Sequence, residues 1–253
     1  MLRALPQKRT KPGNIASLLV CSILAVLSAT NGVGQTAAPA RTGATDAEIA
    51  VTETRMAALR DTFVKATVDA GFTCTIAPPK ILVVDVPSFG TYDPETNTLK
   101  TPSWGQMTDA ERSLFYRVLG PGATETAARG EFETGVHHWV FVHELGHWWQ
   151  ACRGIVNSEK HYRQEFGANR IAAAYWQERD PAVILHQRSV FESILKRPNP
   201  VPEGQSVEPY FDANYQKLGP TPAYIWFQAR MCIAAFDEKP VPTFTEALKQ
   251  TTP

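Results

Sequence analysis

The sequence predicts an α+β fold, with a helix and a small twisted sheet in the N-terminal half and a mainly helical C-terminal half. Residues 46–70 carry apolar side chains at roughly helical spacing, and residues 80–86 form a β-branched run typical of a buried strand. From residue 108 onward, helical and capping patterns follow one another. We therefore expect one domain over residues 46–253, with its functional site between the two halves.

Length and charge limit the partners that can be expected. The chain has 253 residues, 43% of them apolar, and a formal net charge of zero. This apolar content is enough for one sizeable hydrophobic core. The neutral balance gives no reason to expect nucleic acid or an anionic membrane as a partner.

Residues 1–34 have the pattern of a secretory signal peptide. Four basic residues precede an apolar to weakly polar run over residues 15–29, and small residues follow. This run is short for a bilayer span of about 20 residues, so we favour cleavage, with a retained membrane anchor as the alternative. The prediction is a periplasmic or secreted protein without stable membrane insertion. Removal of residues 1–34 takes away four of the 25 basic and none of the 25 acidic residues, which leaves a net charge of −4.

Three cysteines remain after such a cleavage: Cys74, Cys152 and Cys232. An oxidising compartment favours one disulfide and one odd thiol. The sequence leaves the choice of the pair open. Ligation of a metal by these thiols is disfavoured because no close Cys-x-x-Cys spacing exists.

The first elements after a flexible lead-in at residues 35–45 are a long amphipathic helix and short strands. The helix is expected to end at Gly71, and strands are expected at residues 72–76 and 80–86. Turn residues between Asp93 and Asn97 predict a hairpin within residues 90–101.

Helices make up the rest of the chain. Thr108 and Glu111 form a capping box that starts a helix, which Gly120 ends. A loop then leads into the next helix at about residue 134. Helices are expected over residues 134–153, 158–177, 180–196, 222–236 and 244–250.

The stretch His143-Glu144-Leu-Gly-His147 indicates a zinc site. Two histidines four residues apart lie about 40° apart on a helix, so both imidazoles can reach one ion. Glu144 lies about 100° from His143 and can act as the general base that takes a proton from a water acidified by the metal. The flanking residues are uncharged and bulky, which suits a buried helix.

A second helix can supply the third ligand. Glu165 follows His147 by eighteen residues, with Gly154 between them as a helix C-cap, and two antiparallel helices fit this gap. A Glu165 carboxylate would complete a His/His/Glu set with one tetrahedral position open. Asn169, one turn later, can hydrogen-bond the remaining ring N–H of a ligand histidine.

Residues 140–173 resemble the gluzincin metallopeptidases, in which a HExxH helix is followed by a helix with a glutamate ligand in an ExxA, ExxAD or ExxAN pattern. The HELGH and EFGAN segments look most like those of the ImmA/IrrE-type peptidases. The resemblance implies a zincin-like fold with Zn²⁺ on His143, His147 and Glu165.

The same resemblance implies two features of substrate binding. An edge strand ahead of the motif helix commonly lines the cleft, and residues 92–99 are the candidate, with an ordinary surface hairpin as the alternative. A tyrosine or histidine beyond the glutamate helix often faces the developing oxyanion. Tyr224 and Tyr215 are the tyrosines to test, although core packing is the better explanation for either of them alone.

His137 and His138 precede the motif but are not expected to bind the same ion. Ten residues separate His137 from His147, about 15 Å along a helix axis. Capping, packing or a substrate contact explains these histidines better.

Three functional hypotheses follow. The leading one is a zinc peptidase in which Glu144 activates the water that attacks a peptide bond of a peptide or protein substrate. The second is a secreted zinc protein that binds polypeptides, or acts as a chaperone, without turnover. The third is a chance motif in a buried helix without metal. It would leave histidines and glutamates unpaired among apolar residues, which is unfavourable unless they satisfy one another.

Overall fold

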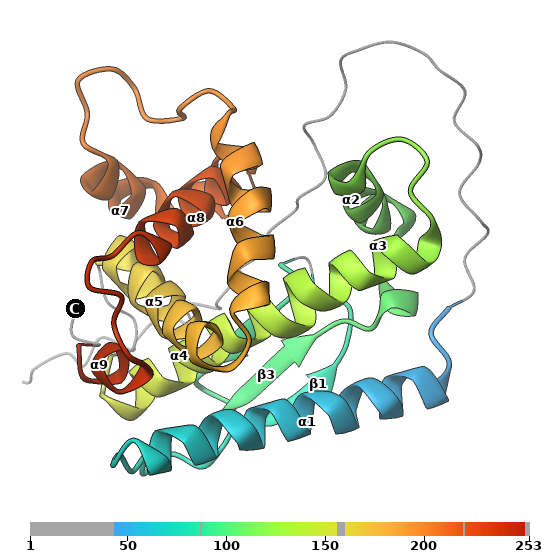
Figure 1. Cartoon of the computed structure of the whole chain (residues 1–253), viewed down its shortest axis with the longest axis horizontal. Coiled ribbons are helices and arrows are strands. Elements are labelled where there is room, and N and C mark those ends of the chain that lie inside the picture. The colour runs from blue at the N-terminus through green and yellow to red at the C-terminus, as the bar shows by residue number, and fades with distance from the viewer. Residues whose placement is uncertain (1–42, 87, 156–159, 220, 251–253) are drawn as a thin grey trace, which may run out of the picture.

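The computed structural model describes residues 43–86, 88–155, 160–219 and 221–250. Within these ranges the fold is α+β, as predicted, and mostly helical with one three-stranded sheet (Figure 1). The predicted signal peptide and most of the predicted lead-in lie outside the described residues. Among the residues that are described, no helix is long and apolar enough to cross a membrane.

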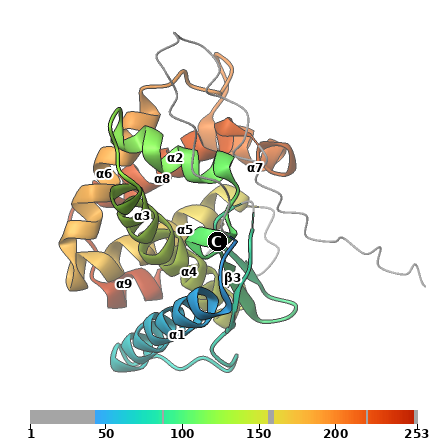
Figure 2. The ribbon, with the colours of Figure 1, turned by 90° about the vertical axis from the view of Figure 1, so that its right-hand side faces the viewer.

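The N-terminal helix α1 (Asp46–Asp69) agrees with the prediction. The Thr45 side chain caps it by accepting a hydrogen bond from the Glu48 backbone N–H, and Gly71 reverses the chain with a φ of 85°. Met56 and Phe63 are buried on its inner face. In both views α1 lies on the side of the molecule farthest from α6, α7 and α8 (Figure 1 and Figure 2).

The sheet contains β1 (Lys80–Val83), β2 (Thr91–Asp93) and β3 (Thr98–Thr101) in the order β1-β3-β2. β1 is parallel to β3, whereas β2 and β3 form the predicted antiparallel hairpin. The edge-strand candidate, residues 92–99, is only half right. Tyr92 lies on the edge strand β2, but its partner Leu99 lies on the central strand and is fully buried.

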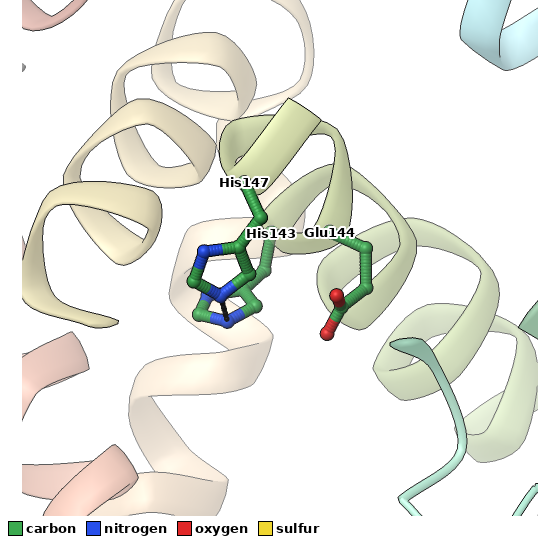
Figure 3. Close-up of side chains that lie close together, drawn as sticks. All are labelled: His143, Glu144 and His147. Carbon is green, nitrogen blue, oxygen red and sulfur yellow. Dashed lines mark hydrogen bonds between the residues drawn. The ribbon is translucent and has the colours of Figure 1, made fainter. Parts of the chain in front are cut away.

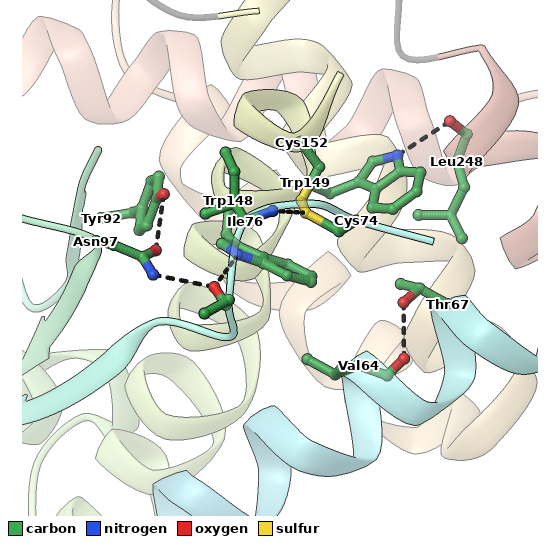
Figure 4. The surroundings of a disulfide bond; sticks show 11 residues. Val64, Thr67, Cys74, Ile76, Tyr92, Asn97, Trp148, Trp149, Cys152 and Leu248 are labelled. Carbon is green, nitrogen blue, oxygen red and sulfur yellow. Dashed lines mark hydrogen bonds between the residues drawn. A yellow bond between two sulfur atoms is a disulfide. The ribbon is translucent and has the colours of Figure 1, made fainter. Parts of the chain in front are cut away.

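The strand predicted at residues 72–76 is wrong. Its backbone is tied to the motif helix: Cys74 is disulfide-bonded to Cys152, and the nearby Ala77 carbonyl accepts hydrogen bonds from the Trp148 indole and the Asn97 amide (Figure 4). Side-chain contacts with the motif helix, rather than pairing in a sheet, therefore fix the position of the segment that was predicted to be a strand. The strand predicted at residues 80–86 ends earlier, at Val83, because its partner β3 ends at Thr101.

Three helical segments run together before the HExxH motif. After η1 (Trp104–Gln106) and α2 (Asp109–Leu119), the segments α3 (Glu125–Phe132), the π-helix η2 (Glu133–Val140) and α4 (Phe141–Cys152) follow without a break. The capping box of Thr108 and Glu111 is confirmed. The loop predicted before residue 134 is wrong, because the Thr124 side chain caps a helix whose Phe132 is buried against Trp104.

The C-terminal half consists of α5 (His161–Arg179), α6 (Pro181–Leu195), α7 (Val207–Leu218), α8 (Pro222–Phe236) and α9 (Phe244–Lys249). Four of these were predicted, with ends that differ by a few residues. α7 was missed because Pro209 lies in a segment interpreted as a Pro/Gly loop. Proline is tolerated in the first turn of a helix, and the fully buried Phe211 anchors this one.

The main core surrounds α4. Trp148 and Trp149 are fully buried there, and the Trp149 indole donates a hydrogen bond to the Leu248 carbonyl of α9 (Figure 4). The Cys74–Cys152 disulfide fastens the end of α4 to the segment that follows α1. The expectation of one disulfide and one odd thiol is thus confirmed, and the free thiol is the buried Cys232.

Candidate metal centre and cleft

The two motif histidines meet at one point beside α4. His143 and His147 project from the same face of the helix, and their Nε2 atoms lie 3.1 Å apart (Figure 3). The side chain of His143 is 9% exposed and that of His147 is 15% exposed. The sequence expectation that both rings can approach one ion agrees with this geometry.

Glu165 reaches the same point from α5. Its Oε2 atom lies 3.3 Å from Nε2 of His143 and 3.6 Å from Nε2 of His147. Ligands of tetrahedral zinc with bonds of about 2.0–2.2 Å are about 3.3–3.6 Å apart. The three atoms therefore have nearly the separations that one zinc ion requires.

Glu144 also has a carboxylate oxygen near the two histidines, within a cluster of 4.8 Å. Two observations favour Glu165 over Glu144 as the third ligand. Glu165 faces both Nε2 atoms from the opposite helix, whereas Oε2 of Glu144 accepts a hydrogen bond of 2.7 Å from the Tyr92 backbone N–H of β2. The carboxylate of Glu144 stands beside the imidazole pair rather than between the rings (Figure 3).

Small residues bring the two ligand helices together. A Cβ atom added to Gly146 would lie 3.0 Å from Cα and 3.1 Å from the carbonyl oxygen of Ala168 on α5. A Cβ atom on Gly167 would lie 2.9 Å from the amide nitrogen of Gln150. The glycine of HELGH and the glycine and alanine of EFGAN thus permit the approach that places Glu165 against the histidines.

Each histidine is oriented by a neighbouring amide. Nδ1 of His143 donates to Oδ1 of Asn169 over 3.0 Å, the kind of contact expected for Asn169. Nδ1 of His147 donates to Oε1 of Gln150 over 2.7 Å. With these amide oxygens as acceptors, both Nδ1 atoms carry protons, which directs the Nε2 lone pairs toward a metal.

The Glu165 carboxylate is held by two donors. The Tyr215 hydroxyl donates to Oε1 and the Gln228 amide to Oε2, each over 2.8 Å. The Gln228 amide also donates to the Tyr224 hydroxyl, and its oxygen accepts from Asn169. The two tyrosines proposed from the sequence therefore lie in the hydrogen-bond network of Glu165, the candidate third ligand.

The charges of the cluster are coupled. Burial lowers the pKa of His147, but the Glu165 carboxylate more than offsets this effect and raises it to about 9. Burial raises the pKa of Glu165, but His147 and His143 hold it well below its usual range. At neutral pH Glu165 is thus ionised, as a metal ligand must be, and His147 carries a proton that a bound metal would displace.

Gly90 allows β2 to lie directly against the motif helix. A Cβ atom there would lie 2.6 Å from a methyl group of Val140 and 3.3 Å from Cγ of Glu144. This close contact brings the Tyr92 N–H to the Glu144 carboxylate. Glu144 as a whole is 9% exposed. The edge strand and the general-base candidate are therefore adjacent.

The group formed by His143, His147, Glu144 and Glu165 is called the metal cluster below. His137 and His138 lie outside it. Nε2 of His137 donates to the Pro102 carbonyl, and Nδ1 faces Glu133 and Arg55. The His138 ring packs against Trp176. Packing and hydrogen bonds within the fold, one of the explanations expected for these histidines, thus account for their positions.

The cluster opens into a cleft of about 970 Å³. Its walls come from β2 and the preceding residues, α2, the continuous η2–α4 helix, α5, α6 and α8. His143, His147, Glu144 and Glu165 all line it, as do Tyr215 and Tyr224. A polypeptide can therefore approach the cluster from solvent.

Comparisons with known proteins do not assign this site. No family model, curated protein or solved structure matches the chain. The argument for its chemistry accordingly comes from its own residues.

Two polar residues of the site were missed in the sequence. Gln150 lies three residues after His147 on the same helix, and Gln228 is one of two strongly polar residues, with Arg230, in the mostly apolar α8. Spacing to the motif could have identified Gln150, because residues three apart are neighbours on a helix. Gln228 is far from the motif in sequence, and only its polarity within an apolar helix marked it.

Proposed function

We propose that this chain is a zinc-dependent peptidase of zincin-like architecture, with zinc on His143, His147 and Glu165. The observation that carries the proposal is the meeting of three ligand atoms from two helices at mutual distances of 3.1, 3.3 and 3.6 Å. Two imidazoles and one carboxylate are the donor set of several catalytic zinc sites. Their hydrogen-bonded supporting amides strengthen the case for a metal.

Zinc in this position would supply Lewis-acid chemistry toward water and a peptide carbonyl. Glu144 takes the proton of the attacking water and passes it to the leaving amine. The Tyr92 N–H holds its carboxylate beside the histidines before substrate binds. Tyr215 and Tyr224 line the cleft on the side of Glu165, where a hydroxyl can donate to a developing oxyanion.

The substrate is an extended peptide or protein segment that lies along β2. β2 is an edge strand that lines the cleft, and a substrate segment beside it would take or share the Tyr92 N–H that donates to Glu144. The Cys74–Cys152 disulfide supports the proposal of a periplasmic or secreted location, because such bonds persist in oxidising compartments.

The test combines metal content with turnover for the wild-type chain and four variants. We expect about one zinc per chain in the wild type and in Glu144→Gln, and sharply weakened zinc binding in His147→Ala and Glu165→Ala. Glu144→Gln should lose hydrolysis of peptide substrates while it keeps zinc. Glu133→Gln removes a glutamate of the same continuous helix outside the cluster and should keep both properties.

Other results identify the alternatives. Hydrolysis retained in Glu144→Gln would refute the assigned base. Zinc binding retained in Glu165→Ala would refute the third ligand. Stoichiometric zinc without cleavage across a broad peptide library would indicate a polypeptide-binding protein without turnover. Absence of metal in every form, with stability unaffected by chelators, would indicate a chance motif.

A further inference from the structure

The cleft wall contains one buried amide that the proposed chemistry does not use. Gln187 of α6 is 3% exposed, and its Nε2 atom has no hydrogen-bond partner among the residues that the structure describes. The amide faces the π-helix η2, where a Cβ atom added to Gly135 would lie 3.8 Å from Nε2. An unpaired buried amide is unfavourable, so such a group calls for an explanation by a ligand or a water.

The surroundings of this amide are mostly apolar. Val136 and Trp139 of η2 and Val190 and Phe191 of α6 line the cleft beside it. Trp139 precedes His143 by one helical turn, and Val136 lies roughly one turn further back. The apolar wall therefore leads from the metal cluster to Gln187.

The edge strand lies beside the same region. Residues 88–90, just before β2, line the same cleft. A substrate segment that lies along β2 can therefore place a side chain in this part of the cleft.

A negative charge on the wall restricts the side chain. Glu131 lies one turn before Gly135, is 7% exposed, and pairs with Nε2 of His186 at 2.9 Å. A substrate carboxylate would meet this like charge, and a cationic side chain would have to compete with His186. An uncharged side chain avoids both penalties.

We propose that this part of the cleft binds a large uncharged side chain with a hydrogen-bond acceptor at its tip, and that Gln187 selects it. Tyrosine fits this description best, because its apolar ring suits the wall and its hydroxyl oxygen can accept from the amide. This inference rests on the proposed peptidase function, since it takes the occupant of the cleft to be a substrate peptide.

The test measures binding rather than turnover. The full zinc-loaded chain with Glu144→Gln is titrated with pooled blocked hexapeptides in which one position is tyrosine, phenylalanine, glutamine, leucine, glutamate or lysine. Tyrosine peptides should bind up to about tenfold more tightly than the matched phenylalanine peptides, as one neutral hydrogen bond allows. Adding Gln187→Leu should remove this difference while phenylalanine peptides still bind. Leu185→Ala, at a 70% exposed site on the same helix, should preserve it.

Thermal unfolding supplies a second readout. If the amide has no hydrogen-bond partner until a ligand binds, Gln187→Leu leaves Tm unchanged or raises it, because an apolar group of similar size replaces an unpaired polar one. A fall of several degrees would mean that the amide is paired within the fold and would overturn the proposal. Equal binding of tyrosine and phenylalanine peptides, preferred binding of glutamate or lysine peptides, or no binding of any pool would also overturn it.

The peptidase proposal can fail separately. It fails if the wild-type chain cleaves none of the pools, whereas the tyrosine preference in the Glu144→Gln background is measured without cleavage. Cleavage by the wild type with equal rates for tyrosine and phenylalanine peptides would leave the peptidase proposal intact and refute the role of Gln187.

Discussion

Two clusters of histidine and glutamate lie on one continuous helix, and only one of them is arranged for a metal ion. In the metal cluster, Nδ1 of His143 donates to an amide and its Nε2 atom faces His147 and Glu165. In the other cluster, Nε2 of His137 donates to a backbone carbonyl, and its Nδ1 atom faces Arg55 as well as Glu133. The difference lies in which ring nitrogens face the other candidate ligands and not in residue type.

The clusters also differ in the elements that surround them. Arg55 of α1 places a permanent positive charge beside Glu133. This charge takes the place that a metal cation could have. Around Glu165 the donors are the neutral Tyr215 and Gln228, which orient the carboxylate without neutralising it. The positive charge beside Glu165 comes instead from His147, whose raised pKa keeps it protonated at neutral pH. A metal ion can replace that proton, whereas the charge of Arg55 is permanent.

The largest expected effect comes from the disulfide. It anchors the end of α4, the helix of the metal cluster, and not the segment that carries Glu133 and His137. Replacing Cys74 and Cys152 by serine should lower the free energy of unfolding by about 2–5 kcal/mol, because the unfolded chain regains a long open loop. Denaturant unfolding measures this loss. Reducing agent should destabilise the wild type but not the double variant, and equal responses of the two would contradict the assignment.

The next effect tests the close helix contact beneath the metal cluster. Gly146→Ala should destabilise the chain by about 1–3 kcal/mol and weaken zinc binding, because its Cβ atom would press on the α5 backbone at Ala168. Gly130 is a matched control, since it is helical, exposed and has nothing within 4 Å of an added Cβ atom. Gly130→Ala should stabilise by roughly 0.5–1 kcal/mol through helix propensity. The same sign for both substitutions would remove the case for the close contact.

A smaller effect separates the amides that support His143 and His147 from the carboxylate that contacts His137. Asn169→Ala and Gln150→Ala should each reduce zinc affinity about 10–100-fold, because a ligand histidine loses its orienting partner. Competition with a chromophoric chelator measures the affinity. Glu133→Gln, which alters the partner of His137 instead, should leave it unchanged. A loss of zinc affinity in that variant would show that the clusters are coupled.

The smallest effect concerns pH. Burial raises the pKa of Glu133, but His137 and Arg55 lower it below its usual value. A depressed pKa stabilises the fold above the unfolded value of about 4.3, and this contribution disappears as pH falls through the folded value. The Tm advantage of the wild type over Glu133→Gln should therefore be constant near neutrality and shrink at acid pH. An advantage that grows on acidification would contradict the cause given.

Local patterns in the sequence predicted much of the fold and the candidate ligands. The i, i+4 histidines, the Thr108–Glu111 capping box and the start of the helix predicted at residue 180 depend on neighbours within one or two turns, so the sequence alone reveals them. The hairpin between β2 and β3 is local for the same reason. The missed helix α7 and the wrong strand at residues 72–76 involve contacts with distant segments.

Tertiary structure alone decided what surrounds the ligands. It paired Cys74 with Cys152, placed Tyr215 and Gln228 on Glu165, and left the Gln187 amide unpaired in the cleft wall. These contacts join residues 50 or more positions apart, or depend on the packing of separate helices, so spacing along the chain carries no signal for them. The sequence by itself determined which groups are candidate metal ligands, and packing determined which of them meet at one point.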